Sequence, residues 1–302
     1  MKTKKLPVFN KNPEEGVSNE YPTSQYAFRQ PCLWYISAVR NSGKSFLASK
    51  FLAQAKKDET FDKIYMITPS FKSNEAYFGK YIDKKDVFEP TRDSISLVIE
   101  QVEKDRDEWE KYLEEKKAYK EFKHKMENGQ VIVDDQLLMY YEMGFLENRE
   151  PKWKYKYEEP PKSLLIMDDI LGSPAIATSS GLMKIATLNR HIAELQTNYK
   201  GRSACGLAVI ILSQSYRMQS GQGIGRSLRE NLSLFTMFKN KQPKQYQAIK
   251  EEIGSVVDSD KFDKAYQYAT AEQYGSLTTD FKPKCETLTF RNNLNEALVF
   301  ED

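Results

Sequence analysis

The sequence has few of the residues that build metal centres and disulfide frameworks. Among its 302 residues there are three cysteines and two histidines. The cysteines, Cys32, Cys205 and Cys285, stand far apart, are odd in number and form no C-x-x-C pair. A zinc site or a disulfide framework is therefore not expected, and the composition fits a reducing compartment.

Long apolar runs and an excess of either charge are also lacking. The longest strongly apolar run, at 207–212, is far too short to cross a bilayer. The Met-Lys-Thr-Lys-Lys start has no apolar core after it, so we do not expect a signal peptide. These features predict a soluble intracellular protein without a membrane span. The sequence has 45 Lys and Arg and 43 Asp and Glu, which gives a net charge of +2. Because this net charge is small, a nucleic acid would have to bind to local basic patches.

The sequence does contain a strand, a loop and a helix in the order of a phosphate-binding P-loop. An apolar run at 33–36 breaks into a small polar turn, Gly-Lys-Ser follows at 43–45, and a helix-compatible stretch runs over 46–55. In such a loop the backbone amides and the helix N-terminus present unpaired donors and partial positive charge to phosphate. The candidate nucleotide-binding residues are Arg40, Asn41, Ser42, Gly43, Lys44, Ser45 and Phe46.

Two of these residues have specific expected roles. Lys44 adds a full charge for the β- and γ-phosphates of ATP, and the Ser45 hydroxyl can hold Mg²⁺. The motif departs from G-x-x-x-x-G-K-[ST] in one place, because Ala38 stands where the first glycine belongs. Alanine costs little at a tight turn if its φ stays negative.

A second apolar strand ends in two carboxylates. The run Ser-Leu-Leu-Ile-Met at 163–167 leads into Asp168 and Asp169, and acids at the carboxyl end of a buried parallel strand fall where open α/β sheets bind ligands. Asp168 is expected to hold Mg²⁺, directly or through water. Asp169 takes the place of a catalytic base for the attacking water, a position where Glu is commoner and one methylene longer. The alternative is that the two acids merely cap the next helix.

A third apolar strand, expected at 206–213, ends in Gln214. A polar side chain at that strand tip can reach the γ-phosphate or its water, so Gln214 is a candidate catalytic sensor; a capping role is the alternative. Arginines from a neighbouring subunit commonly neutralise charge in γ-phosphate transfer. The candidates are Arg190 and the arginines around a glycine-rich loop at 220–225, which are Arg217, Arg226 and Arg229.

The fold class that these motifs predict is α/β: a RecA-like (ASCE) P-loop NTPase, with a mainly parallel sheet flanked by helices and a charged helical insertion. We expect an arm at 1–30, the ATPase domain at 31–255 with the mostly helical insertion at 83–160, and a helix and strand extension at 256–302. Further expected elements are strands at 63–68, 234–238 and 286–290 and helices at 181–196, 243–253 and 258–271.

The insertion begins with a long charged helix at 95–127, whose interrupted apolar seam has heptad-like spacing. The helix either covers one side of the core with a solvated outer face or serves as a subunit-contacting or lever helix. Further along, residues 152–157 alternate Lys with Trp or Tyr. That pattern either grips phosphates and stacks on bases or forms a half-buried strand with its lysines outward.

Together the motifs resemble the FtsK/HerA superfamily of P-loop ATPases, and within it the poxvirus-type genome-packaging ATPases of double-stranded DNA viruses. The resemblance covers about 33–80 and 160–255 and rests on 39–45, 165–169, 189–191, 209–215 and 228–231. It implies a hexameric or pentameric ring that uses ATP and Mg²⁺ to pump double-stranded DNA into a capsid. It also implies Gln214 as sensor, Arg190 or Arg229 as the arginine acting in trans, and a capsid portal or vertex protein as partner. The expected location is the host cytoplasm or nucleoid during virion assembly.

Other functions remain open from the sequence. A terminase-like phage packaging motor, or another DNA-translocating P-loop ATPase or helicase, would show nearly the same core motifs. A small-molecule or nucleotide kinase would need an acceptor pocket and a lid. A nucleotide-regulated structural ring protein would assemble with ATP and turn over little of it.

Overall fold

The computed structural model describes residues 19–147, 149–170, 172–177, 180–214, 216, 226–240 and 242–300. Its main feature is a nine-stranded sheet of order β11-β10-β9-β8-β1-β7-β4-β2-β3. The strands from β8 to β3 in that order run parallel, and β9, β10 and β11 continue the sheet in antiparallel fashion. No helix among the described residues is both long enough and apolar enough to span a bilayer.

The bounds of the strands follow. The parallel strands are β1 (Leu33–Ser37), β2 (Lys63–Ile67), β3 (Val87–Phe88), β4 (Ser163–Asp168), β7 (Leu207–Ser213) and β8 (Leu234–Phe238). The antiparallel strands are β9 (Ser276–Asp280), β10 (Phe290–Asn292) and β11 (Glu296–Ala297), and a separate hairpin is formed by β5 (Glu194–Tyr199) and β6 (Arg202–Ala204).

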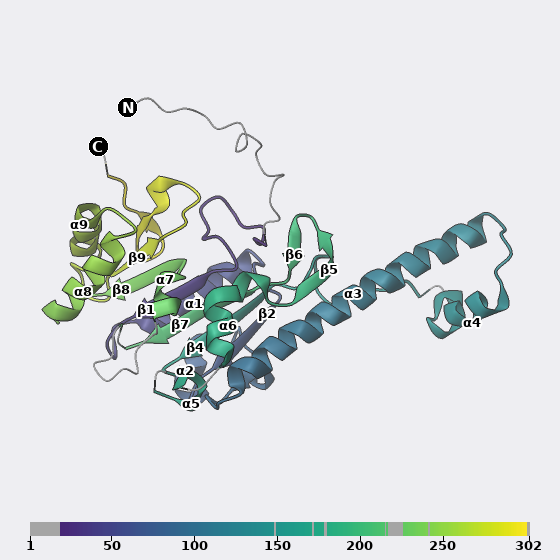
Figure 1. Ribbon diagram of the computed structural model, residues 1–302, viewed down its shortest axis with the longest axis horizontal. Coiled ribbons are helices and arrows are strands. Elements are labelled where there is room, and N and C mark those ends of the chain that lie inside the picture. Colours follow the sequence, from purple (N-terminus) through teal and green to yellow (C-terminus); the bar gives the residue numbers. More distant parts are fainter. Residues whose placement is uncertain are drawn as a thin grey trace, which may run out of the picture.

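Helices cover both faces of the sheet (Figure 1). They are α1 (Lys44–Lys57), α2 (Phe71–Phe78), α3 (Ser94–Glu127), α4 (Asp134–Glu142), α5 (Pro174–Ala177), α6 (Ser180–Leu188), α7 (Arg226–Glu230), α8 (Pro243–Gly254) and α9 (Ser259–Ala269). Short 3-10 turns are η2 (Lys84–Asp86), η3 (Phe145–Glu147), η4 (Asn189–His191) and η5 (Glu286–Leu288). The expected α/β class with a mainly parallel sheet is confirmed.

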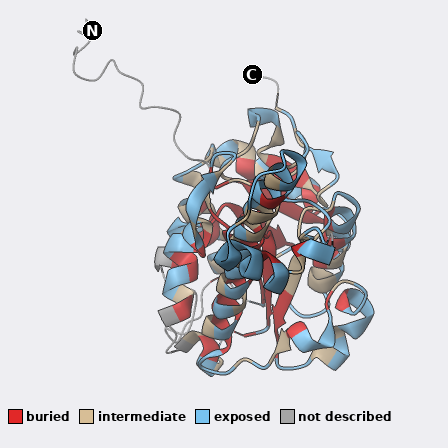
Figure 2. Cartoon of the chain, turned by 90° about the vertical axis from the view of Figure 1, so that its right-hand side faces the viewer, coloured by how far each residue is buried: buried red, intermediate tan, exposed pale blue. Residues whose placement is uncertain are grey.

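The central strands form because their residues are apolar on both faces. In β1, β4 and β7 nearly every residue is buried, as parallel strands covered on both sides require. Alternate side chains of β1 point to opposite faces of the sheet and belong to two hydrophobic cores. Trp34 and Ile36 pack with residues of α1 and α2, whereas Tyr35 packs with residues of α3, α6, α8 and α9. Figure 2 shows the buried residues concentrated in these strands, beneath the exposed outer sides of the helices.

The expected long helix is α3, and only its first part lies on the core. Its buried apolar residues lie between Ile95 and Tyr112, with the exception of Phe122 further along. The second part extends outward from the body as an arm, and α4 folds back against its far end (Figure 1). Phe122, Tyr140 and Phe145 form a small apolar cluster there.

Three expected elements differ from the structure. Residues 152–157 form no strand; this segment packs on α3, where Trp153 meets Trp109 edge to face at 5.0 Å. The helix expected at 181–196 ends at Leu188, and the chain turns through Ala193 with φ of 58° into the β5–β6 hairpin. The strand expected at 286–290 is the 3-10 turn η5 followed by β10.

Candidate functional site

Three parallel strands bring the predicted site residues to one edge of the sheet. Strand β7 lies between β1 and β4, with Ser37 opposite Ser213 and Asp168 opposite Leu212. The segments that follow these strands therefore meet at their carboxyl ends, where open α/β sheets bind ligands. Two backbone hydrogen bonds tie the edge together: Ala38 N to Ser213 O at 3.0 Å, and Asp169 N to Leu212 O at 3.1 Å.

The loop after β1 has the backbone that a phosphate cradle needs. Gly43 has φ of 98° and caps α1, which begins at Lys44, and Asn41 has φ of 63°. A side chain at Gly43 would be strained at that φ. Ala38 has a negative φ, since it is not among the residues of positive φ. The departure from glycine at this position is therefore compatible with the turn.

The loop residues differ in their exposure. Arg40, Asn41 and Phe46 are exposed, and Ser42, Gly43, Lys44 and Ser45 are half-buried. The Ser42 hydroxyl donates to the carbonyl of Val39, which closes the turn from within. The half-buried residues surround the N-terminus of α1, where a phosphate would find free amides.

Lys44, Asp168, Asp169 and Gln214 lie together, as the sequence predicts. Lys44 Nζ is 3.3 Å from Asp169 Oδ1 and 4.0 Å from Asp168 Oδ1. Gln214 Nε2 donates to both carboxylate oxygens of Asp169, at 3.2 and 2.9 Å. The structure thus joins the cation of the loop, the two acids of β4 and the amide at the tip of β7 in one contact network.

Asp168 is the buried member of this group, with an exposed fraction of 4%. Burial raises the pKa of its carboxyl to about 6, an effect that Lys44 and a hydrogen bond from Asn74 oppose and that Asp169 reinforces. Asn74 Nδ2 donates to Asp168 Oδ2 at 2.6 Å. Sequence reasoning missed Asn74, which lies on α2 in no recognised motif; the order of β2 and β4 in the sheet is what brings it to the site.

The donor set suits a magnesium nucleotide. Among the described residues no group of three or more His, Cys, Asp or Glu side chains could hold a metal ion alone. Mg²⁺ in nucleotide sites is held by one or two protein oxygens, phosphates and several waters, and Ser45 and Asp168 supply oxygens of that kind. The buried Asp168 carboxylate, which has only Lys44 and Asn74 beside it to offset its burial, would gain from a cation.

The candidate arginines do not join this group. The backbone carbonyl of Arg190 lies near Gly206, which comes directly before β7. Arg190 is therefore at the amino ends of the parallel strands, whereas Lys44 and the two acids are at the carboxyl ends. Arg229, in α7, pairs with Glu252 at 2.7 Å and lies over the ring of Tyr216 at 5.8 Å. Any role for either at a γ-phosphate would be at the site of another subunit. Arg226 begins α7, and Ser215, Arg217 and the glycine-rich loop lie outside the described residues.

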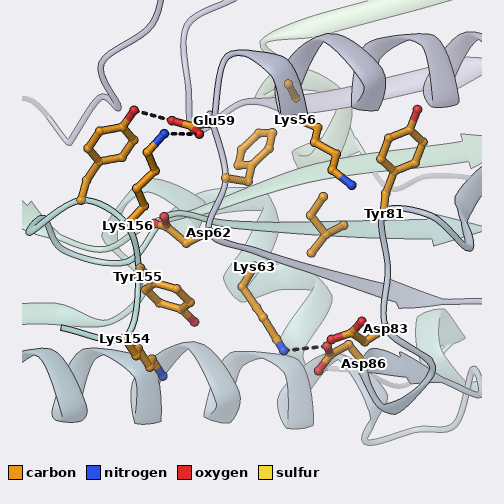
Figure 3. A pocket seen from close by; sticks show the side chains of 14 residues that line it. Lys56, Glu59, Asp62, Lys63, Tyr81, Asp83, Asp86, Lys154, Tyr155 and Lys156 are labelled. Carbon is orange, nitrogen blue, oxygen red and sulfur yellow. Dashed lines mark hydrogen bonds and ion pairs between the residues drawn. The ribbon is translucent and has the colours of Figure 1, made fainter. Parts of the chain in front are cut away.

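The lysine and aromatic segment at 152–157 borders a hollow of about 470 Å³ (Figure 3). Two of its three lysines are paired with carboxylates: Lys154 contacts Asp105 at 2.5 Å and Glu108 at 2.6 Å, and Lys156 contacts Glu59 at 2.5 Å. Since these lysines already have acidic partners, the contacts do not favour the phosphate-gripping interpretation of the segment.

No family model and no curated protein matches the chain. Among solved structures, the genome packaging NTPase B204 from Sulfolobus turreted icosahedral virus 2, in complex with sulfate, is similar at 14% identity and a TM-score of 0.44, over 87% of this chain and 96% of that one. EssC (ATPases 2 and 3) from Geobacillus thermodenitrificans is similar at 13% identity and a TM-score of 0.37, over 78% and 40%. The pCW3 conjugation coupling protein TcpA, with ATPγS, is similar at 12% identity and a TM-score of 0.37, over 80% and 61%. These similarities are too distant to assign a function, which has to come from the geometry of the site.

Proposed function

We propose that the protein is an ATPase that couples ATP hydrolysis to movement along double-stranded DNA. One observation carries the enzymatic part: Lys44, Asp168, Asp169 and Gln214 converge from the ends of three adjacent parallel strands, beside the N-terminus of α1. A phosphate-binding lysine, a buried acid, a second acid and a polar strand tip are the parts that nucleotide hydrolysis requires.

Each residue has a role that its position supports. Lys44 and the amides around Gly43 bind the phosphates, and Ser45 and Asp168 would hold Mg²⁺, which neutralises charge that develops on the phosphate oxygens. Asp169 orients the attacking water and accepts its proton. Bound phosphates would draw Lys44 away from Asp169 Oδ1, and that oxygen would then accept a hydrogen bond from the attacking water. Gln214 stays in contact with Asp169 and senses the γ-phosphate.

The proposal extends to a homo-oligomeric ring that packages a viral genome into a capsid, docked on a portal or vertex protein. The order of the motifs along the sequence supports this extension. So does the position of Arg190 and Arg229, which lie apart from the group formed by Lys44, Asp168, Asp169 and Gln214 in the same chain. An arginine supplied by one subunit to the nucleotide of the next would couple hydrolysis to contact between subunits. Arg229 would have to leave Glu252 to act in this way.

The test is an ATPase assay with and without double-stranded DNA, with the mass of the assembly measured in the presence of ATP. We expect turnover to rise with DNA. The Lys44→Ala variant should lose about 100-fold or more of that turnover, because it removes a preorganised phosphate contact. Lys57→Ala is the matched control, since Lys57 is an exposed lysine at the far end of the same helix, and it should keep full activity.

Other results would reject the proposal in distinct ways. Undiminished turnover in Lys44→Ala would reject the site. Turnover that needs a small acceptor and ignores DNA would indicate a kinase. Assembly that requires ATP but proceeds without steady hydrolysis would indicate a nucleotide-regulated structural ring.

A further inference from the structure

Strand β9 begins at the edge of the sheet where the proposed nucleotide site lies (Figure 1). It pairs with β8 in antiparallel fashion, and Ser276 at its start lies opposite Phe238 at the end of β8. Strand β8 is parallel to β1 and adjacent to it. The residues just before β9 therefore arrive at the carboxyl ends of the parallel strands, next to the loop that follows β1. Tyr274 is one of these residues.

Tyr274 lies against the phosphate-binding loop. A Cβ atom at Gly43 would lie 3.6 Å from Cδ1 of Tyr274 and 3.8 Å from its Cβ. The ring of Phe238 approaches the same position to 3.6 Å, but Phe238 is buried. Tyr274 is 60% exposed, and among the described residues its side chain has no ring contact and no hydrogen bond. The loop thus has an exposed aromatic ring beside it that no other side chain uses.

The backbone of Tyr274 has a conformation that residues with a bulky side chain rarely adopt. Its φ is 66°, in the left-handed region. The turn around it is tightly fixed, because a Cβ atom at Gly275 would lie 2.2 Å from the carbonyl oxygen of Ala269, and Gly275 N donates to Glu272 O at 3.2 Å. Strained residues of this kind cluster at active sites and ligand clamps. The turn holds the ring beside the loop in spite of the strain.

Helix α1 borders the same space from the other side. Lys50 Nζ donates to the carbonyl of Asn293 at 3.2 Å. Asn293 Oδ1 in turn accepts from the backbone N–H of Ser276 at 3.1 Å, two residues after Tyr274. Phe46 precedes Lys50 by one helical turn, so the two side chains share one side of α1. Phe46 is 63% exposed, and it lies on the side of the helix that faces the start of β9.

The order of the strands indicates which end of a nucleotide would lie near Tyr274. The acids and Gln214, which act on the γ-phosphate in the proposed mechanism, follow β4 and β7 on one side of β1. Tyr274 precedes β9, on the other side of β1. The base and the γ-phosphate are the opposite ends of ATP. A nucleotide whose phosphates lie on the loop after β1 would therefore direct its base toward Tyr274.

We propose that Tyr274 binds the base of the nucleotide by stacking on it, with Phe46 bordering the same space. Aromatic side chains stack on the flat face that every base presents, and an exposed ring needs no rearrangement to receive one. This inference rests on the proposed function, because it concerns the same nucleotide. It adds a contact for the base to a site whose other residues contact only phosphate, Mg²⁺ and water.

The test measures binding by calorimetry on the full-length protein, with Mg²⁺ present. One ligand is a non-hydrolysable ATP analogue, and the other is inorganic tripolyphosphate, which has the phosphates and no base. Tyr274→Ala should raise the Kd of the ATP analogue about 10-fold, because one stacking contact is lost, and should leave the Kd of tripolyphosphate unchanged. Tyr274→Phe keeps the ring and should bind both ligands as the parent protein does.

Two further variants serve as controls. Tyr141→Ala is the matched control, because Tyr141 is 65% exposed and lies on α4, at the far end of the arm; it should change neither Kd. Lys44→Ala should weaken both ligands, since Lys44 binds the phosphates that the two ligands share.

The outcomes separate this inference from the proposed function. If neither ligand binds the parent protein, the nucleotide site itself is rejected, and the inference is rejected with it. If both ligands bind the parent and Tyr274→Ala weakens them equally, or weakens neither, only the role of Tyr274 is overturned. A loss of ATP binding in Tyr274→Phe as large as that in Tyr274→Ala would also overturn it, because the hydroxyl and not the ring would then make the contact.

Discussion

Asp169 holds a backbone conformation that few residues other than glycine adopt. Its φ is 53°, in the left-handed region that is sparsely populated by residues with a side chain. Strain of this kind persists at functional sites where the surroundings hold it; here the backbone bond to Leu212 and the side-chain contacts from Lys44 and Gln214 do so. The turn after β4 places the two consecutive acids in different environments, with Asp168 buried and Asp169 exposed.

We assign Asn74 a positioning role, because its side chain donates to Asp168, the proposed Mg²⁺ ligand. Asn74→Ala removes the hydrogen bond of 2.6 Å that orients Asp168 Oδ2. We expect the Mg²⁺ concentration for half-maximal ATP turnover to rise about 10-fold, with little change in kcat at saturating Mg²⁺. Ser73→Ala, on the same helix, is the control and should leave the Mg²⁺ dependence unchanged. An equal fall of kcat at every Mg²⁺ concentration would contradict the positioning role.

Asp62 makes the stability of the protein depend on pH. Burial raises the pKa of its carboxyl above the usual value, although Lys162 lowers it. A carboxyl with a raised folded-state pKa favours folding while it is protonated, so its contribution falls as pH rises through and above 3.8, the ordinary value. Asp62→Asn keeps an oxygen for the backbone N–H of Lys162. The variant should melt at a higher temperature than the parent at pH 7.5, and the gap should close at pH 3.5. A constant gap at both pH values would contradict this.

At the scale of elements, α3 is anchored by a buried carboxylate. Asp105 accepts from Tyr155 Oη at 3.0 Å and from Lys154 Nζ at 2.5 Å, and Tyr65 Oη lies at 3.5 Å. One helix residue thus fixes both the adjacent strand β2 and the segment at 152–157. The arm can extend from the body because this base is held by polar contacts as well as by its apolar residues.

Removal of that carboxylate should loosen the base of the helix. Asp105→Ala leaves two tyrosine hydroxyls without their acceptor and takes from Lys154 one of its two carboxylate partners, so we expect a loss of about 2–4 kcal/mol in the free energy of unfolding. The measurement is a urea unfolding curve. Glu114→Ala, an exposed residue on the same helix, is the control and should change the midpoint little. A loss in Asp105→Ala no larger than in Glu114→Ala would show that the carboxylate is not an anchor.

The elements differ in how far sequence could predict them. Strands β1, β4 and β7 were predictable, because continuous apolar runs and the polar residues after them fix both the strand and its functional end. Strand β9 was missed because its residues, Ser-Leu-Thr-Thr-Asp, resemble a loop, although the sheet buries them. Strand β5 is largely exposed, so it has no apolar pattern to mark it. Asn74 and the φ of Asp169 depend on neighbours that only the folded sheet supplies.

At the scale of the whole molecule, the three thiols occupy different environments. Burial raises the pKa of Cys32 and of Cys205 to about 12, whereas hydrogen bonds from Thr287 lower the pKa of the exposed Cys285. At pH 8 we expect iodoacetamide to label one thiol in the folded protein and three after unfolding. Mass spectrometry counts the labels, and Cys285→Ser should abolish the labelling of the folded protein. Labelling of Cys32 or Cys205 without unfolding would contradict the burial.

The position of β1 in the sheet has a consequence for how the protein is made. Both neighbours of β1 come late in the chain, since Leu33 pairs with Val209 and Trp34 with Leu234. During synthesis the strand that precedes the P-loop therefore has no partner in the sheet until Val209, which follows Leu33 by 176 residues, has been made. Such long-range pairing slows folding and leaves the apolar side chains and the unpaired backbone of β1 unprotected in the meantime. A chain interrupted before residue 207 lacks every strand partner of β1 in the sheet, so the proposed nucleotide site can form only after synthesis is well past the midpoint of the sequence.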